Sequence, residues 1–264
     1  MKFFDSHAHY WDTRFEKETE AGADALIDHL LDTTVSGIVN VGTNLETTRL
    51  SIAQAKKHEG MYAVGGVHPG DIPADLQTDD LERLFAPLFQ SPENKLLALG
   101  EIGLDYHYVP FDKERQMAFF EAQMALAEKL ALPVVIHDRE AHGDCFDMIR
   151  RFPNVRGVFH SYSGSAEMAK ALVSRGYMIS FSGTVSFTNA RSVKEAAAVL
   201  PKECVMIETD APYLTPHPHR GKMNHSGYLS YTATALSELW SLPLSEVAKI
   251  TEENALKFFG ISHA

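Results

Sequence analysis

Six side chains of this sequence, four histidines and two carboxylic acids, are of the right types and in the right places to bind divalent metal ions. Histidine is a common metal ligand, and the chain contains 13 histidines but only 2 cysteines. The clearest local signal is His7-Ala8-His9, because alternate residues of an extended segment point the same way and both rings can reach one ion. The preceding Asp5 favours metal ligands over a pair of surface histidines.

The other candidate ligands stand where short apolar runs stop. Glu101 lies between two glycines, where a carboxylate has little use as a core residue and suits a bridging ligand. His137 and His160 end two successive runs, and Asp210 follows the last run. Either histidine alone would more simply be a core residue. Their identical placement indicates that both are ligands.

Eight β-branched or aromatic runs alternate with longer amphipathic stretches. The runs are Lys2–Asp5, Gly37–Gly42, Met61–Val67, Lys95–Gly100, Leu132–His137, Arg156–His160, Tyr177–Phe181 and Cys204–Glu208. Among the longer stretches, Asp112–Leu130 carries apolar residues at helical spacing. Eight strand–helix repeats in 264 residues predict an α/β fold, a (β/α)8 TIM barrel forming one domain over residues 1–264. An open doubly wound sheet is the alternative.

A barrel would bring all six candidate ligands into one pocket. The carboxyl ends of its strands meet on a single face, the face that carries active sites. Gathering imidazoles and carboxylates there costs desolvation energy unless cations neutralise them. We therefore expect one or two divalent cations in this pocket. Asp210 is the candidate to accept a proton from metal-activated water.

A second group of polar residues is expected to contact substrate. Its members are His68, Asp105, Arg139, Tyr162, His219 and Arg220. Arg139, His219 and Arg220 are candidates for binding phosphate oxygens, with solvated surface charge as the alternative. Tyr162 would either stack on a base or pack in the interior. The remaining histidines of helical or terminal context are expected to be exposed: His29, His58, His142 and His263.

Composition and charge limit the possible functions. The chain is 45% hydrophobic and 22% charged, which excludes disorder, collagen and coiled coil as its main state. A net charge of -11 excludes a broadly basic surface for nucleic acid, although a local groove remains possible. No apolar run approaches the roughly twenty residues of a membrane span. Cys145 and Cys204 are isolated from one another, so we expect a cytoplasmic protein without disulfides.

Several motifs together resemble the TatD family of metal-dependent deoxyribonucleases, in the amidohydrolase-like barrel superfamily. They are Asp5-Ser6-His7-Ala8-His9, Gly66-Val67-His68-Pro69, Gly100-Glu101-Ile102-Gly103-Leu104-Asp105-Tyr106, Pro133-Val134-Val135-Ile136-His137 and Glu208-Thr209-Asp210-Ala211-Pro212-Tyr213-Leu214. The resemblance covers essentially the whole chain.

The resemblance implies a two-metal site and a DNA substrate. One ion would be held by His7, His9, Glu101 and Asp210, and a second by Glu101, His137 and His160. Family members typically use Mg²⁺ or Mn²⁺, although Zn²⁺ also occurs in such sites. They act on DNA, some as 3′-to-5′ exonucleases, so single strands or 3′ ends are the expected substrate. No membrane and no obligate protein partner are implied.

Two departures from the family pattern affect substrate identity more than metal binding. His160-Ser161-Tyr162-Ser163-Gly164 stands where a His-Cys-Phe-Ser/Thr-Gly segment is usual. Lys222-Met223-Asn224-His225-Ser226 replaces a usual Lys-Arg-Asn-Glu-Pro, with loss of a positive charge. Three alternatives therefore stay open: a hydrolase of small esters, amides or lactones on the same barrel, a deacylase of misacylated tRNA, and a non-catalytic metal-binding module.

Overall fold

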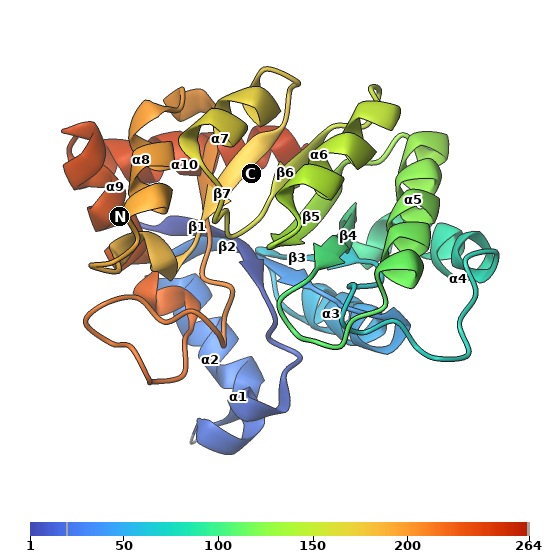
Figure 1. The fold of residues 1–264 in the computed structure, drawn as a ribbon. Helices are drawn as coiled ribbons and strands as arrows, with labels where there is room; N and C mark the ends of the chain where they lie inside the picture. The colour runs from blue at the N-terminus through green and yellow to red at the C-terminus, as the bar shows by residue number, and fades with distance from the viewer. Residues whose placement is uncertain (20, 263–264) are drawn as a thin grey trace.

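The computed structural model describes residues 1–19 and 21–262 (Figure 1). Eight parallel strands follow one another in chain order in a single sheet that forms a nearly closed barrel. The strands are β1 (Phe3–Ala8), β2 (Val35–Val41), β3 (Met61–Gly65), β4 (Leu96–Asp105), β5 (Val134–Arg139), β6 (Gly157–Phe159), β7 (Met178–Phe181) and β8 (Val205–Ile207). The predicted TIM barrel is confirmed, and each of the eight predicted runs overlaps one of these strands.

Helices alternate with the strands and surround them (Figure 1). The α-helices are α1 (Thr13–Glu18), α2 (Gly22–Thr33), α3 (Leu45–Lys57), α4 (Asp80–Phe89), α5 (Lys113–Leu130), α6 (His142–Arg151), α7 (Ala166–Val173), α8 (Arg191–Val199), α9 (Leu229–Trp240) and α10 (Leu244–Phe259). Four short 3-10 turns are η1 (Pro92–Asn94), η2 (Gly183–Ser186), η3 (Lys202–Cys204) and η4 (Ser226–Tyr228). Within the described residues, none of these helices is long and apolar enough to cross a membrane.

The two faces of the sheet bury different clusters, which explains the near-continuous apolar runs of the sequence. Val134 belongs to a cluster shared with the surrounding helices. Its neighbour Val135 belongs to a second cluster, which contains Phe4 of β1 and Phe258 and Phe259 of α10. Strands covered on both faces carry apolar residues at consecutive positions. The last helix therefore packs on the strands.

The barrel approaches closure between β1 and the segment after β8. Ala8 pairs with Ala211 in an isolated parallel bridge. The amide of His9 donates to the carbonyl of Ala211 at 2.7 Å, and the amide of Asp210 donates to the carbonyl of His7 at 2.9 Å. This seam places two histidines from the start of the chain beside an aspartate from its far end.

Strand β4 continues five residues beyond its predicted end at Gly100, to Asp105. Glu101 consequently lies inside a strand rather than at its end. Two glycines permit a close approach to β5: a Cβ on Gly100 would lie 2.7 Å from the Cβ of Val135, and one on Gly103 only 2.0 Å from the carbonyl oxygen of His137. The sequence predicts a strand end at Gly100. In the structure both glycines lie inside β4, where they allow it to pair closely with β5.

Candidate metal centre

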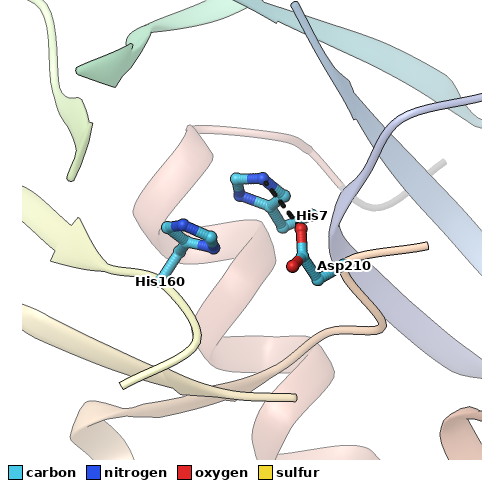
Figure 2. Close-up of side chains that lie close together, drawn as sticks. All are labelled: His7, His160 and Asp210. Atoms are coloured by element: carbon cyan, nitrogen blue, oxygen red, sulfur yellow. Dashed lines mark ion pairs between the residues drawn. The ribbon is translucent and has the colours of Figure 1, made fainter. Parts of the chain in front are cut away.

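The structure brings all six predicted metal ligands together at the carboxyl end of the barrel. His7 lies in β1 and His9 directly after it, Glu101 in β4 and His137 in β5, while His160 follows β6 and Asp210 follows β8. Figure 2 shows His7, His160 and Asp210 converging from three distant segments. The rings of His7 and His160 stack with centroids 4.0 Å apart, and His7 Nε2 lies 3.7 Å from Asp210 Oδ1.

Glu101 stands between two pairs of histidines. Its Oε1 lies 2.7 Å from both His137 Nδ1 and His160 Nε2. Its Oε2 lies 3.3 Å from His7 Nε2 and 3.8 Å from His9 Nε2. Each carboxylate oxygen thus faces a different pair of ring nitrogens. This arrangement suits a carboxylate shared between two metal ions.

Outer hydrogen bonds orient three of the four rings. The pairs are His9 Nδ1 with the carbonyl of Val41 at 2.7 Å, His137 Nε2 with Asp105 Oδ2 at 3.0 Å, and His160 Nδ1 with Glu208 Oε1 at 3.2 Å. In each pair the acceptor oxygen holds the proton on the outer nitrogen. With a cation bound, the inner nitrogen would present its lone pair to that cation, as in histidines that ligate metals.

The donor set fits a divalent cation. Among the described residues, four groups of side chains offer ligand atoms that all lie within 4.8 Å of one another, and three of them consist of the predicted ligands: His7, His9 and Glu101; Glu101, His137 and His160; and His7, His160 and Asp210. His7 Nε2 and His9 Nε2 face each other at 3.2 Å. The buried Nδ1 of His7 has no hydrogen-bond partner within the part of the chain that the structure describes. Nitrogen and oxygen atoms that converge in this way, without sulfur, match imidazole–carboxylate metal sites.

The electrostatics of the centre depend on close carboxylate–imidazole pairs. Burial alone would raise the pKa of Glu101, but the charges of His160 and His68 and the hydrogen bonds of nearby rings hold it well below its usual value. Burial alone would lower the pKa of His160, yet Glu101 and Glu208 raise it well above its usual value. Glu101 is therefore ionised, and positive charge gathers around it. A bound cation would supply that charge instead.

His68 and Asp105, predicted as substrate contacts, lie against the centre itself. Together with His137 they form a further group of possible ligands. His68 packs edge-on against the ring of His137 with centroids 4.4 Å apart, and its Nε2 lies 3.6 Å from Glu101 Oε1. Burial, together with the charge of His137, lowers the pKa of His68 to about 3. Asp105 orients His137, which is a role that the sequence did not reveal.

A cleft of about 1130 Å³ opens above the centre. Its lining includes His9, Glu101, His137, His160 and Asp210 from the centre. Arg139 also lines it, with its guanidinium 4.9 Å from the ring centre of Tyr108. Arg139 is thus placed to meet an anionic substrate in the cleft.

Three other predicted substrate contacts lie away from the cleft lining. Tyr162 is only 2% exposed, and its hydroxyl donates to the carbonyl of Ser165 at 2.7 Å, so it packs in the interior. His219 stacks on Tyr228, and its Nε2 lies 2.8 Å from the hydroxyl of Tyr231. Arg220 places its guanidinium 4.3 Å from the ring of Phe187, which does line the cleft. Arg220 therefore packs behind Phe187, which belongs to the cleft wall. None of these three residues lines the cleft.

The expectation that His58 is exposed is wrong. Its side chain is buried, with Nδ1 2.6 Å from Asp28 Oδ1 and Nε2 2.9 Å from Asp24 Oδ1. It caps the end of α3 and pairs with two carboxylates of α2, an interhelical contact that sequence spacing does not reveal. His29 is exposed as expected, while His142 is half-buried and pairs with Asp138 at 2.8 Å. His263 lies outside the described residues.

Two buried carboxylates support the centre in ways that the sequence reasoning did not assign to them. Glu208 accepts hydrogen bonds from the amide of Ser161 at 2.7 Å and from His160. Asp5 accepts from the hydroxyls of Thr209 and Ser226, both at 2.6 Å. Each stands two residues from a ligand in the motifs Asp5-Ser6-His7 and Glu208-Thr209-Asp210, and that spacing was the available signal.

Comparisons with known proteins agree with this architecture. The family model described as "TatD related DNase" matches residues 4–260. The uncharacterized metal-dependent hydrolase YabD of Bacillus subtilis is 35% identical over 261 residues, which are 98% of this chain and 99% of the relative. The uncharacterized metal-dependent hydrolase TatD of Mycobacterium tuberculosis is 35% identical over 246 residues, 90% of each chain.

A solved structure supports the same relationship. The TatD homologue YJJV of Escherichia coli matches with a TM-score of 0.89 and 27% identity, over 98% of both chains. The resemblance read from the motifs is thereby confirmed across the length of the barrel. The chain belongs to the TatD family of metal-dependent hydrolases.

Proposed function

We propose that this chain is a deoxyribonuclease that hydrolyses phosphodiester bonds of single-stranded DNA or of 3′ ends, with two divalent cations per subunit. The observation that carries the proposal is the position of Glu101, whose two oxygens face different pairs of histidines. Paired-metal sites suit the in-line displacement of phosphoryl transfer. The description of the matching family model supports DNA as the substrate class.

The residues divide into two ligand sets that share Glu101. We assign His7, His9, Glu101 and Asp210 to one set, and Glu101, His137 and His160 to the other. His7, His9 and Glu101 group together, as do Glu101, His137 and His160, and Asp210 joins the first set through its 3.2 Å approach to His9. The candidates are Mg²⁺, Mn²⁺ and Zn²⁺, because carboxylates suit the first two and imidazoles suit the last. A divalent cation bound here would lower the pKa of water and offset negative charge on a phosphoryl oxygen.

Asp210 is the residue that we assign to proton transfer. It lines the cleft, and its Oδ1 lies 3.2 Å from His9 Nε2. Burial alone would raise the pKa of Asp210, but the hydrogen bond with His9 and the charge of His160 lower it. The ionised carboxylate can therefore accept a proton from the attacking water and pass it to the leaving oxygen.

Arg139 is the cleft residue that we assign to substrate charge. Its guanidinium lines the cleft beside Tyr108 and can donate two parallel hydrogen bonds to a phosphate. Asp105 and His68 do not contact the phosphate in this assignment. They orient and enclose the His137 ring.

The test is a substrate panel on the full-length protein, stripped of metal and reloaded with Mg²⁺, Mn²⁺ or Zn²⁺. The panel contains end-labelled single-stranded DNA, a duplex with a 3′ overhang, small esters, amides and lactones, and a misacylated tRNA. We expect metal-dependent shortening of DNA from its 3′ end. Turnover of a small ester or of the acylated tRNA, with intact DNA, would overturn the nuclease assignment.

The acidic character of the chain favours one second candidate, hydrolysis of small esters, amides or lactones. The net charge of -11 repels a long polyanion, whereas a small neutral substrate is unaffected. The same ligands would serve both reactions. The salt dependence of KM separates them, because phosphate contacts weaken steeply as the salt concentration rises.

A further inference from the structure

Two aromatic side chains of the cleft lining flank His9. The Trp11 ring lies edge-on to the His9 ring with centroids 5.6 Å apart, and the Tyr213 ring does the same at 6.1 Å. Both side chains line the cleft, together with His9 and Asp210. A substrate whose reacting group lies at this end of the metal centre would therefore meet Trp11 and Tyr213.

Trp11 is fixed relative to the metal centre by a shared acceptor. Its Nε1 donates to the carbonyl of Val41 at 2.6 Å. The same carbonyl accepts from His9 Nδ1 at 2.7 Å. The indole and a predicted metal ligand are thus held by one oxygen atom, so the position of the indole is set before any substrate binds.

Two contacts hold Tyr213 in place: the guanidinium of Arg14 lies over its ring, and its backbone is bonded to that of Asp210. Its amide donates to the carbonyl of Asp210 at 2.8 Å. The guanidinium of Arg14 lies 4.3 Å from the ring centre, and Asp12 holds this guanidinium through bonds of 2.8 and 3.1 Å. Although Arg14 covers part of the ring, Tyr213 remains 45% exposed. Because Tyr213 is held in place and partly exposed, part of its ring is available to contact a ligand.

We propose that Trp11 and Tyr213 form a stacking subsite for a nucleobase of the substrate, next to the scissile phosphodiester. This inference rests on the proposed nuclease function and extends it to the base. Stacking on aromatic rings accepts every base, because each base has a π face, and it binds single strands without sequence preference. It also adds affinity that does not depend on neutralising phosphates, which suits a chain with a net charge of -11.

The first experiment uses the fluorescence of Trp11. The chain has 2 tryptophans, and the other, Trp240, is buried in α9 with its indole bonded to the carbonyl of Ala197. The full chain, with Mg²⁺ or Zn²⁺ added, is titrated with dAMP and, in parallel, with deoxyribose 5-phosphate. We expect saturable quenching by dAMP only. Quenching should be lost in Trp11→Phe and kept in Trp240→Phe.

The second experiment measures whether cleavage depends on the base. Oligonucleotides that carry either a base or an abasic residue beside the scissile bond are compared. Tyr213→Ala should raise KM about tenfold for the base-containing substrate, the size expected for one lost stack, with a smaller change in kcat. The abasic substrate should show no such rise. Tyr213→Phe keeps the ring and should behave as the wild type.

The outcomes separate this inference from the nuclease assignment. Equal KM values for abasic and base-containing DNA in the wild type, together with no quenching by dAMP, would overturn the stacking subsite while phosphodiester cleavage stands. If no DNA is cleaved but small esters are, the nuclease assignment fails. In that case the dAMP titration still decides whether these two rings bind a base. This titration uses the wild-type chain, so it does not depend on the folding of a variant.

Discussion

Glu101 and Asp210 both lie in the metal centre, but the structure gives them separable roles. Glu101 lies within 4 Å of all four histidine ligands, whereas Asp210 comes that close to two of them, His7 and His9. We expect Glu101→Ala to lose at least one bound metal ion, as read by metal analysis of the dialysed protein.

Asp210→Asn keeps an oxygen ligand and should retain its metal content while losing turnover by more than about a hundredfold, the low end for general acid–base catalysis. Full activity of Asp210→Asn would rule out its role as proton acceptor.

Glu208 acts on the centre through His160. Its Oε1 accepts from His160 Nδ1 at 3.2 Å and from the amide of Ser161 at 2.7 Å. Glu208→Ala removes the one oxygen that accepts from both groups, so the His160 ring loses its fixed orientation. We expect metal affinity to fall by about 10- to 100-fold, the usual effect of removing such a partner, measured by competition with a chelator. Glu208→Gln keeps an acceptor oxygen and should lose less affinity. Equal affinity of the alanine variant and the wild type would contradict this positioning role.

At the scale of elements, the pairing of β4 with β5 places Glu101 beside His137. The register pairs Gly103 with His137, and a Cβ at Gly103 would lie 2.0 Å from the His137 carbonyl oxygen. Its φ of +140° also lies in a region that favours glycine. We expect Gly103→Ala to separate the two strands and to lower the free energy of unfolding by about 3 kcal/mol, a value in the range of strained backbone sites, measured by urea denaturation.

The control for this prediction is Gly143→Ala in α6, where a Cβ would meet nothing within 4 Å. This substitution should stabilise the helix slightly, because alanine favours helices by about 1 kcal/mol over glycine. Both variants add one methyl group, but only at Gly103 does it meet a neighbouring strand on a backbone with a φ of +140°. Equal unfolding midpoints would show that the β4–β5 contact does not limit stability.

The sequence predicts the strands and helices better than it predicts the contacts between them. The apolar runs predict all eight strands, and the start of α5 fits because Asp112 is its N-cap, with its side chain accepting from the amide of Arg115. The polar residues at the strand ends predict the ligands, since a barrel has one carboxyl face. The burial of His58 between two carboxylates of α2 was not predictable, because it depends on how helices pack. The interior position of Tyr162 depends on packing in the same way.

At the scale of the whole molecule, the barrel approaches closure where β1 meets the segment after β8, and metal ligands lie on both sides of this seam. His7 and His9 come from one side and Asp210 from the other, joined by backbone bonds of 2.7 and 2.9 Å. Asp5 accepts from the amide of Thr209 at 3.0 Å and thereby crosses the same seam. A cation bound to His7, His9 and Asp210 would connect the two ends of the sheet. Metal binding should therefore affect the stability of the entire fold.

Removal of the metal should lower the unfolding temperature of the whole barrel. A ligand that binds only the folded state at 100 times its Kd adds about 2.7 kcal/mol to the free energy of unfolding. For a chain of this size such a change corresponds to a rise of roughly 5 to 10 °C in Tm. The measurement is calorimetry of the chelator-treated chain with added Mg²⁺, Mn²⁺ or Zn²⁺, and the ion that gives the largest rise identifies the tightest ligand. Glu101→Ala is the matched control and should show a smaller rise. If every ion leaves Tm unchanged in the wild type, the six side chains do not form a metal site that stabilises the fold.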